Sequence, residues 1–137
     1  MCNKEFEHSF KKKYSAAERK AECDKIIEKY PTRIPTIIEN GIGSTIQSMP
    51  RKKFLLPFNI TVSQLISIFR KKILLNPCES IFIFMEDNTI PIQTSEMADL
   101  YKTYKNKDDG FLYITYKGEN TFGVWMIPYN TLLNTDE

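Results

Sequence analysis

A few residues of this 137-residue chain carry side chains that could perform catalysis or bind a ligand, and their spacing limits that chemistry. The only histidine, His8, lies near a chain end that we expect to be mobile, and no serine, cysteine or lysine stands in a recognised nucleophile motif. Gly41-Ile42-Gly43 lies outside a strand-to-helix context, which favours a hairpin loop over a phosphate loop. Asp108 and Asp109 precede Gly110 as turn residues do, rather than as metal ligands. The sequence therefore predicts a protein that is not an enzyme and uses no metal or cofactor.

Cysteine spacing and net charge narrow the class of protein further. Cys2, Cys23 and Cys78 are widely spaced, which fits neither a disulfide framework nor paired zinc ligands and favours a reducing compartment. A formal net charge of +2 creates no field that would concentrate the chain on nucleic acid. The N-terminus lacks an apolar leader, and no stretch of about 18 apolar residues follows, so we expect a cytosolic protein without a membrane span.

The segment from Ser15 to Tyr30 has the signals of an α-helix. Ser15 and Glu18 form a capping box, in which each side chain accepts a hydrogen bond from the other residue's amide. An apolar stripe follows at three- and four-residue spacing, made of Cys23, Ile26, Ile27 and Tyr30. Pro31 disfavours helical geometry in the residue before it, so the helix should end there. The segment from Glu5 to Tyr14 is too short and too charged for a strong helix alone, and we expect a short docked turn.

Two apolar-rich segments, Arg33 to Glu39 and Lys52 to Phe58, predict the strands of a long-looped hairpin. The loop between them contains glycine, serine and proline, which favour turns. Pro35 and Pro57 lie inside the two strands, where a missing amide proton is tolerated mainly on an edge or at a bulge. We therefore expect at least one of these strands to have a free edge.

The rest of the chain predicts a long helix, a returning strand, and a final helix and strand. Thr61 and Gln64 form a second capping box, and the helix that follows turns one apolar face inward, made of Leu65, Ile66, Phe69 and Ile73. The other expected elements are strands over Ser80 to Met85, Ile90 to Ile92 and Phe111 to Lys117, and a helix over Met97 to Tyr104 capped by Thr94 or Ser95. Two antiparallel strands, a long helix and a returning strand make a β-grasp. The expected fold class is therefore α+β, a ubiquitin-like β-grasp with an N-terminal helical extension.

Separated segments then carry an ordered set of motifs between Phe10 and Gly123. They are Phe10-Lys11, Tyr30 to Glu39, Lys53 to Pro57, Arg70-Lys71-Lys72, Asp109 to Tyr113, and Glu119 to Gly123. In this order they resemble the autophagy ubiquitin-like modifiers, the microtubule-associated protein light chain 3 and GABA-receptor-associated protein group. The longer first helical region and the ending Thr121-Phe122-Gly123 are more similar to the light chain 3 branch.

The resemblance implies a role for the tail. A dedicated cysteine protease would recognise Phe122 and cut after Gly123, and ubiquitin-like activating and conjugating enzymes would pass Gly123 as a thioester to phosphatidylethanolamine. The implied divisions are an N-terminal helical extension (1–30), a ubiquitin-like domain (31–123) and a discarded propeptide (124–137). The protein would then reside in the cytoplasm and on the autophagosome membrane. The alternative is that Val124 to Ile127 continues the last strand and packs as core.

The resemblance also implies a docking site for cargo receptors that carry a short aromatic-x-x-aliphatic motif, added as a strand beside Lys52 to Pro57. The implied aromatic pocket is lined by Glu22, Ile26, Pro35, Ile37, Leu55 and Phe111. The implied aliphatic pocket is lined by Phe54, Leu56, Pro57, Leu65, Ile68 and Lys72. Lys12, Arg51 and Lys53 would contact acidic residues that flank the motif. Without the resemblance, Phe54 and Leu65 would be assigned to an ordinary core.

Other functions stay open on the sequence alone. An unconjugated adaptor of the same fold would keep its tail and only bind motif peptides. Phe6, Phe10 and Lys11 to Lys13 could form a variable arm for partner or membrane contact, although a solvated face also explains the basic run. A remote alternative is a small nucleic-acid-binding domain that uses Arg70 to Lys72, for which affinity would fall steeply with salt.

Overall fold

The structure is a computed structural model that describes residues 8–41, 44, 46–73 and 80–118, and the statements below concern these residues. Predictions about Phe6, Cys2, Cys78, Phe122, Gly123 and the segment 124–137 lie outside them.

A four-stranded mixed sheet forms the centre of the molecule, with the strand order β2-β1-β4-β3. Its strands are β1 (Arg33–Asn40), β2 (Lys53–Pro57), β3 (Ile81–Met85) and β4 (Leu112–Gly118). β1 pairs antiparallel with β2 and parallel with β4, and β3 pairs antiparallel with β4. The antiparallel pairs β1–β2 and β3–β4 are thus joined through the parallel pairing of β1 with β4 at the centre of the sheet. This arrangement confirms the ubiquitin-like β-grasp.

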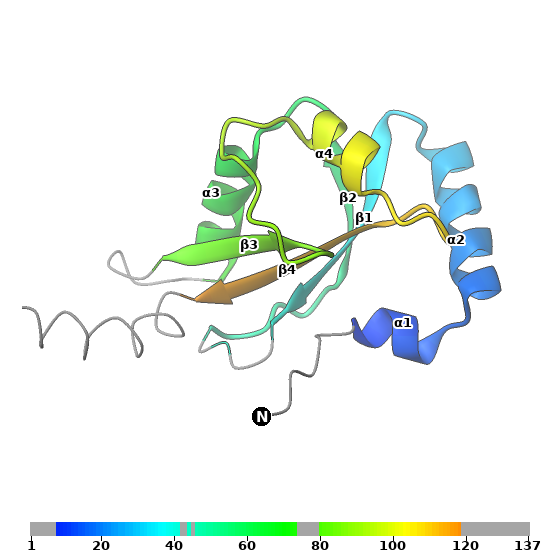
Figure 1. Cartoon of the computed structure of the whole chain (residues 1–137), viewed down its shortest axis with the longest axis horizontal. Coiled ribbons are helices and arrows are strands. Elements are labelled where there is room, and N and C mark those ends of the chain that lie inside the picture. The colour runs from blue at the N-terminus through cyan, green and yellow to red at the C-terminus, as the bar shows by residue number, and fades with distance from the viewer. Residues whose placement is uncertain (1–7, 42–43, 45, 74–79, 119–137) are drawn as a thin grey trace, which may run out of the picture.

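Helices cover both faces of this sheet (Figure 1). α1 (Ser9–Lys13) and α2 (Ala16–Lys29) lie on one side, and α3 (Val62–Ile73) and α4 (Met97–Tyr104) on the other. Because helices cover both faces of the sheet, the two central strands, β1 and β4, are buried along almost their whole length. The larger core, on the α3 and α4 side, includes Ile38, Leu65 and Ile114, and a smaller core under α1 and α2 includes Phe10 and Phe111.

The two expected capping boxes are confirmed in detail. Glu18 N–H donates to Ser15 Oγ at 3.2 Å, and Ser15 N–H donates to Glu18 Oε1 at 2.9 Å. α2 ends at Lys29, with Tyr30 as its C-cap. Before α3, Thr61 N–H donates to Gln64 Oε1 at 2.8 Å, and Gln64 N–H donates to Thr61 Oγ1 at 3.2 Å.

The free edge expected from the prolines is β2, which among the described strands has a neighbour only on the β1 side. Pro57 is the last residue of β2. Pro35 lies in β1, opposite Leu55 of β2, whereas the pairing of β1 with β4 begins only at Thr36. At Pro35 the strand therefore has a neighbour on one side, so the missing amide proton removes no bond to β4.

Two local predictions are wrong. The segment Ile90 to Ile92 forms no strand, because Pro91 offers no amide to a ladder and the preceding turn closes through Met85 N–H and Thr89 O at 2.8 Å. The N-cap of α4 is Glu96, rather than Thr94 or Ser95, and it makes no side-chain cap bond. Backbone carbonyls replace the side-chain cap: Met97 N–H donates to Ile60 O at 2.8 Å, and Ala98 N–H donates to Phe58 O at 3.0 Å.

Candidate functional site

The free edge of β2 is the candidate docking edge, because an added peptide strand can pair only where a strand lacks a neighbour. The side chains expected to form pockets lie on both sides of this edge, on α2 and β1 toward one face and on α3 toward the other. Leu55, in the middle of β2, is 37% exposed. An apolar side chain of a partner can therefore reach it without unfolding the sheet.

The residues of the expected aromatic pocket come together in and beside the smaller core. Ile37 and Phe111 are buried within this core, Ile26 packs against it, and Leu55 faces solvent. Pro35, also buried, lies opposite Leu55 in the β1–β2 register. Lys53 Nζ donates to Glu22 Oε1 at 2.8 Å, which joins β2 to α2. Ile37 and Phe111 are thus part of the core, whereas Leu55 and the Lys53–Glu22 ion pair lie at the surface.

The residues of the expected aliphatic pocket divide between the larger core and the surface. Leu56 and Leu65 are buried, and Phe54 packs against them as a half-buried side chain. Pro57 is half-buried, Ile68 is 41% exposed, and Lys72 is exposed. A cavity of about 380 Å³ opens beside Phe54 and Lys72; its other lining residues are Gln47, Ser48, Met49, Pro50, Arg51 and Ile73. Of the six residues expected to line the aliphatic pocket, two therefore line this cavity, Phe54 and Lys72.

The three expected charge contacts lie together in a second, larger cavity. This cavity, of about 790 Å³, lies between α1 and the start of β2 and is lined by Ser9, Phe10, Lys12, Lys13, Tyr14, Arg51, Lys52 and Lys53. Lys53 Nζ lies 5.3 Å from the ring centroid of Phe10 and 6.0 Å from that of Tyr14. We call this 790 Å³ cavity the basic cavity. Its lysines and arginine favour an acidic ligand.

The sequence reasoning missed Glu39, which holds α1 on the sheet. α1 has no side-chain cap of its own, and Glu39 at the end of β1 supplies one: its carboxylate accepts from Ser9 N–H at 3.1 Å, Ser9 Oγ at 2.7 Å and Phe10 N–H at 3.2 Å. Lys52 Nζ lies 3.6 Å from the same carboxylate. This contact explains why a segment too short to be helical alone is helical here.

His8 belongs to the same network, so the expectation that it lies at a mobile end is wrong. The side chain is 3% exposed, with Nδ1 3.3 Å from Glu39 Oε2 and Nε2 3.3 Å from Thr115 Oγ1. Burial alone would raise the pKa of Glu39, but the contacts with His8, Ser9 and Phe10 outweigh it and lower that pKa to about 2. Glu39 is therefore an ionised acceptor at neutral pH.

A second missed network ties α2 to the loop before β4. The Arg19 guanidinium forms a buried ion pair with the Asp109 carboxylate, and Tyr113 OH donates to Asp109 Oδ2 at 2.5 Å. Asp109 Oδ1 also accepts from Phe111 N–H at 2.8 Å. Burial and the bond to Asp109 raise the pKa of Tyr113. Asp109 is thus more than a turn residue, because it fixes the backbone of Phe111 beneath α2.

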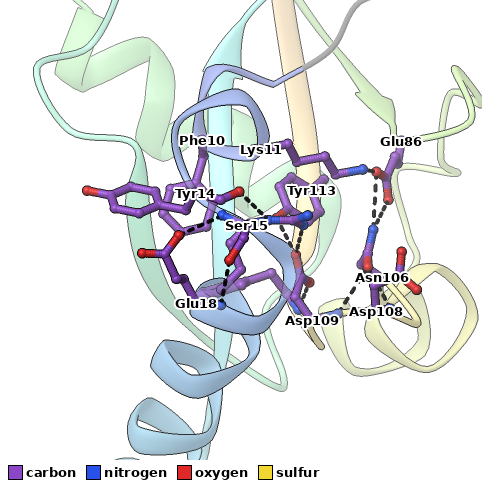
Figure 2. Close-up of polar contacts among 12 residues, drawn as sticks. Phe10, Lys11, Tyr14, Ser15, Glu18, Glu86, Asn106, Asp108, Asp109 and Tyr113 are labelled. Atoms are coloured by element: carbon purple, nitrogen blue, oxygen red, sulfur yellow. Dashed lines mark hydrogen bonds and ion pairs between the residues drawn. The ribbon is translucent and has the colours of Figure 1, made fainter.

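Lys11 makes a third link, from α1 to the turn that follows β3, the strand at the sheet edge opposite β2. Figure 2 shows its ammonium group at the carboxylate of Glu86, which also accepts from Asn106 Nδ2 at 3.2 Å. Asn106 Oδ1 in turn accepts from Asp108 N–H at 2.8 Å. One lysine of the basic run is therefore engaged, whereas Lys12 and Lys13 are exposed.

The described part of the chain offers little for covalent chemistry. Cys23, the free cysteine within it, is buried, and this burial, with the charge of Asp109, raises the pKa of its thiol to about 11. At neutral pH the thiol stays protonated and is a poor nucleophile. Across the described helices, none combines the length and the apolar character that crossing a bilayer requires.

Comparisons with known proteins identify the family. The family model described as "Autophagy protein Atg8 ubiquitin like" matches residues 18–123. Autophagy-related protein 8 of Candida glabrata is 47% identical over 115 residues, which cover 84% of this chain and 96% of that protein. Autophagy-related protein 8d of Arabidopsis thaliana is 44% identical over 117 residues, which cover 85% and 96%.

A solved structure agrees with these sequence matches. The crystal structure of Trypanosoma brucei ATG8 superposes with a TM-score of 0.77 at 34% identity, over 83% of this chain and 97% of that one. Whether the chain belongs to the light chain 3 branch stays a prediction. The chain belongs to the Atg8 family of autophagy proteins, which are ubiquitin-like modifiers and not enzymes.

Proposed function

We propose that this protein is made as a precursor, cut after Gly123, and joined through the new carboxylate to phosphatidylethanolamine on autophagosomal membranes. The observation that carries the proposal is the extent of the family match, which ends at Gly123 and leaves 124–137 beyond it. Phe122 precedes this glycine and would be the recognition handle of the processing protease. Gly118, the last described residue, is also the last residue of β4, and the proposed cleavage point lies five residues further along the chain.

Glycine suits the chemistry of this step. A cysteine protease would hydrolyse the bond between Gly123 and Val124. An activating enzyme would then join the freed carboxylate to the AMP part of ATP, with release of pyrophosphate, and its cysteine thiolate would displace AMP to form a thioester. The amine of phosphatidylethanolamine would then attack the thioester carbonyl, an amide would form and the enzyme's thiolate would leave. Because glycine has no Cβ, its extended backbone fits a narrow channel and its carbonyl is open to attack. Two acyl chains hold a protein stably on a membrane, whereas one anchors it marginally.

The second part of the proposal is that cargo receptors and other autophagy factors dock on the free edge of β2. The aromatic residue of the motif would enter beside Ile26 and Leu55, and the aliphatic residue would lie beside Phe54 and Ile68. Acidic residues before the motif would be attracted to the basic cavity. Burial of each large apolar side chain is worth about 1.5 to 3 kcal/mol, whereas exposed ion pairs contribute roughly 0 to 1 kcal/mol each. The pockets would therefore set the affinity, and the charges would tune it.

Intact mass tests the processing proposal. We expect the protein purified from cells with active autophagy to end at Gly123, alone or with a phosphatidylethanolamine adduct, as read by mass spectrometry. The matched control is Gly123→Ala, which should keep residues 124–137 and stay out of the membrane fraction. A wild-type chain that still ends at Glu137 after autophagy is induced would contradict the proposal and favour the unconjugated adaptor.

Leu55→Ala tests the docking proposal. Because Leu55 is 37% exposed, its truncation should disturb the core little. Binding can bury at most this exposed part of Leu55, so the truncation removes roughly 0.6 to 1.1 kcal/mol of apolar burial, which corresponds to about 3- to 6-fold weaker binding. The measurement is isothermal titration calorimetry with a synthetic peptide that carries aspartates before a Trp-x-x-Leu motif. Ile92→Ala is the control, because Ile92 is 72% exposed and lies in the loop after β3, at the opposite edge of the sheet. Equal affinities of wild type and Leu55→Ala would refute this placement.

A further inference from the structure

The basic cavity gathers positive charge that acidic residues elsewhere in the chain balance. Five of the chain's 19 lysines and arginines line it, two on α1 and three at and just before the start of β2, whereas none of the 17 aspartates and glutamates is among its described lining residues. We propose that this cavity binds a compact ligand that carries several phosphate groups on one ring, of the inositol phosphate class. Neither peptide docking nor tail cleavage is required for this binding, so it goes beyond the proposed function.

Three of the five cations are available to a ligand. Lys52 and Lys53 each lie near a carboxylate, one of β1 and one of α2. The other three, Lys12, Lys13 and Arg51, are exposed, and none of them forms an ion pair with a residue that the structure describes. Like charges around one cavity repel one another, and a ligand with several negative charges relieves this repulsion.

Aromatic rings hold two of the ammonium groups at the cavity without neutralising them. Lys13 Nζ lies 5.5 Å from the ring centroid of Tyr14, and Lys53 Nζ lies 5.3 Å from that of Phe10. The two rings pack on each other, with their centroids 5.2 Å apart. The face of an aromatic ring attracts a cation but carries no net charge. These contacts therefore position positive charge and leave it able to attract an anion.

The placement of the cations favours a ring of phosphates over an acidic peptide. The cations stand on two walls, one formed by α1 and the other by the segment that leads into β2. In a peptide strand added to β2, successive side chains point to opposite faces of the sheet, so only every second acidic residue would face α1. A ring with phosphates around it presents negative charge to both walls at once. Lysine binds phosphate as a point charge, and arginine can bind it bidentately.

The size of the cavity agrees with such a ligand, and its position has a consequence for α1. A volume of about 790 Å³ lies within the range of small-molecule sites, roughly 300 to 1,000 Å³. A ligand that contacts both walls would tie α1 to the start of β2 and add to the contact that Glu39 makes with α1. Hydrogen exchange of the α1 amides should therefore slow when the ligand binds.

The test is calorimetric titration of the full chain with inositol hexakisphosphate. Lys12→Ala with Lys13→Ala should weaken binding about 5- to 25-fold, because an exposed ion pair is worth up to about fivefold. Arg51→Ala removes a cation from the other wall and should also weaken binding, whatever the first variant does to α1. The matched control is Lys25→Ala with Lys29→Ala, which removes two exposed lysines of α2 outside the cavity and should leave the affinity unchanged.

Several outcomes would overturn the proposal. They are absence of binding at millimolar probe, equal weakening by the Lys12/Lys13 and Lys25/Lys29 variants, and hydrogen exchange of α1 that the probe leaves unchanged. The last two would show that the probe only adsorbs to surface charge. A peptide with aspartates before the motif should compete with the probe, but binding of the probe itself is measured without any peptide, so it stands or falls independently of the docking proposal.

Vesicles distinguish the two sources of such a ligand. If the ligand is a lipid headgroup, the chain should bind vesicles that contain phosphatidylinositol bisphosphate more tightly than phosphatidylserine vesicles of equal charge, and the Lys12/Lys13 variant should lose this preference. If the ligand is free in solution, the chain should bind the soluble probe and show no preference between the vesicles. Equal binding to both kinds of vesicle without binding of the soluble probe would overturn the proposal, because general membrane charge would then explain the attraction.

Discussion

Replacing Asp109 with alanine is expected to lower the free energy of unfolding by about 3 to 5 kcal/mol. The variant would leave the buried Arg19 guanidinium without its carboxylate, Tyr113 OH without its acceptor and Phe111 N–H without Oδ1. Removal of one partner from a buried ion pair costs more than the pair contributes, because the remaining charge stays out of water. Urea denaturation followed by circular dichroism measures the change.

Asp108→Ala is the control for this prediction, because Asp108 is the exposed neighbour of Asp109 in the same turn. Its unfolding free energy should stay within about 0.5 kcal/mol of wild type. A further check is the double replacement Arg19→Met with Asp109→Leu, which removes both charges and should recover much of the lost stability. If Asp109→Ala unfolds at the same urea concentration as Asp108→Ala, the ion pair does not hold α2 to the β4 side of the sheet.

Glu39→Gln is expected to destabilise the protein by about 2 kcal/mol at pH 7 and to change its response to acid. A glutamine offers one oxygen where the carboxylate offers two, and its amide group would face an N–H donor of α1. Because the pKa of Glu39 is lowered in the folded state, from its ordinary 4.5 to about 2, the carboxylate stabilises the fold fully above pH 4.5. This contribution is lost as the pH falls from 4.5 toward 2.

The difference between wild type and Glu39→Gln should therefore be large at pH 7 and shrink as the pH is lowered below 4.5. Urea denaturation at pH 7 and pH 3 measures it. Glu28→Gln changes an exposed glutamate on α2 and serves as the control, with little effect at either pH. A stability difference for Glu39→Gln that is the same at both pH values would show that the carboxylate charge is not what holds α1.

The fold could be predicted from the sequence because its signals are local. The capping boxes at Ser15 and Thr61 fixed two helix starts, and Pro31 fixed the end of α2. The prolines also predicted a free edge on at least one of the first two strands, and the order of two antiparallel strands, a long helix and a returning strand predicted the β-grasp. Where a local rule failed, a tertiary contact had replaced it: carbonyls from the 58–60 segment cap α4, so no capping side chain was required.

The networks around α1 and α2 could not be predicted in the same way, because their members are far apart in the chain. Glu39 lies 30 residues from Ser9, and Asp109 lies 90 from Arg19. Each side chain alone is typical of a solvated surface. One signal was available: Glu39 lies near the end of an apolar strand that is buried on both faces, so a carboxylate there needs hydrogen-bond donors. The docking and cleavage residues came from resemblance and stay predictions.

The central parallel pairing of β1 with β4 has a consequence for how the chain acquires its structure. β1 and β2 are close in sequence and can pair early, but β1 finds its other neighbour only when Leu112 to Gly118 has been synthesised. Pairings between distant segments form slowly, because a long loop must close first. Until then Ile34, Ile37 and Ile38 lack one side of their packing. The nascent chain therefore carries an unsatisfied strand edge through most of its synthesis, and a chaperone would have its longest opportunity to act at β1.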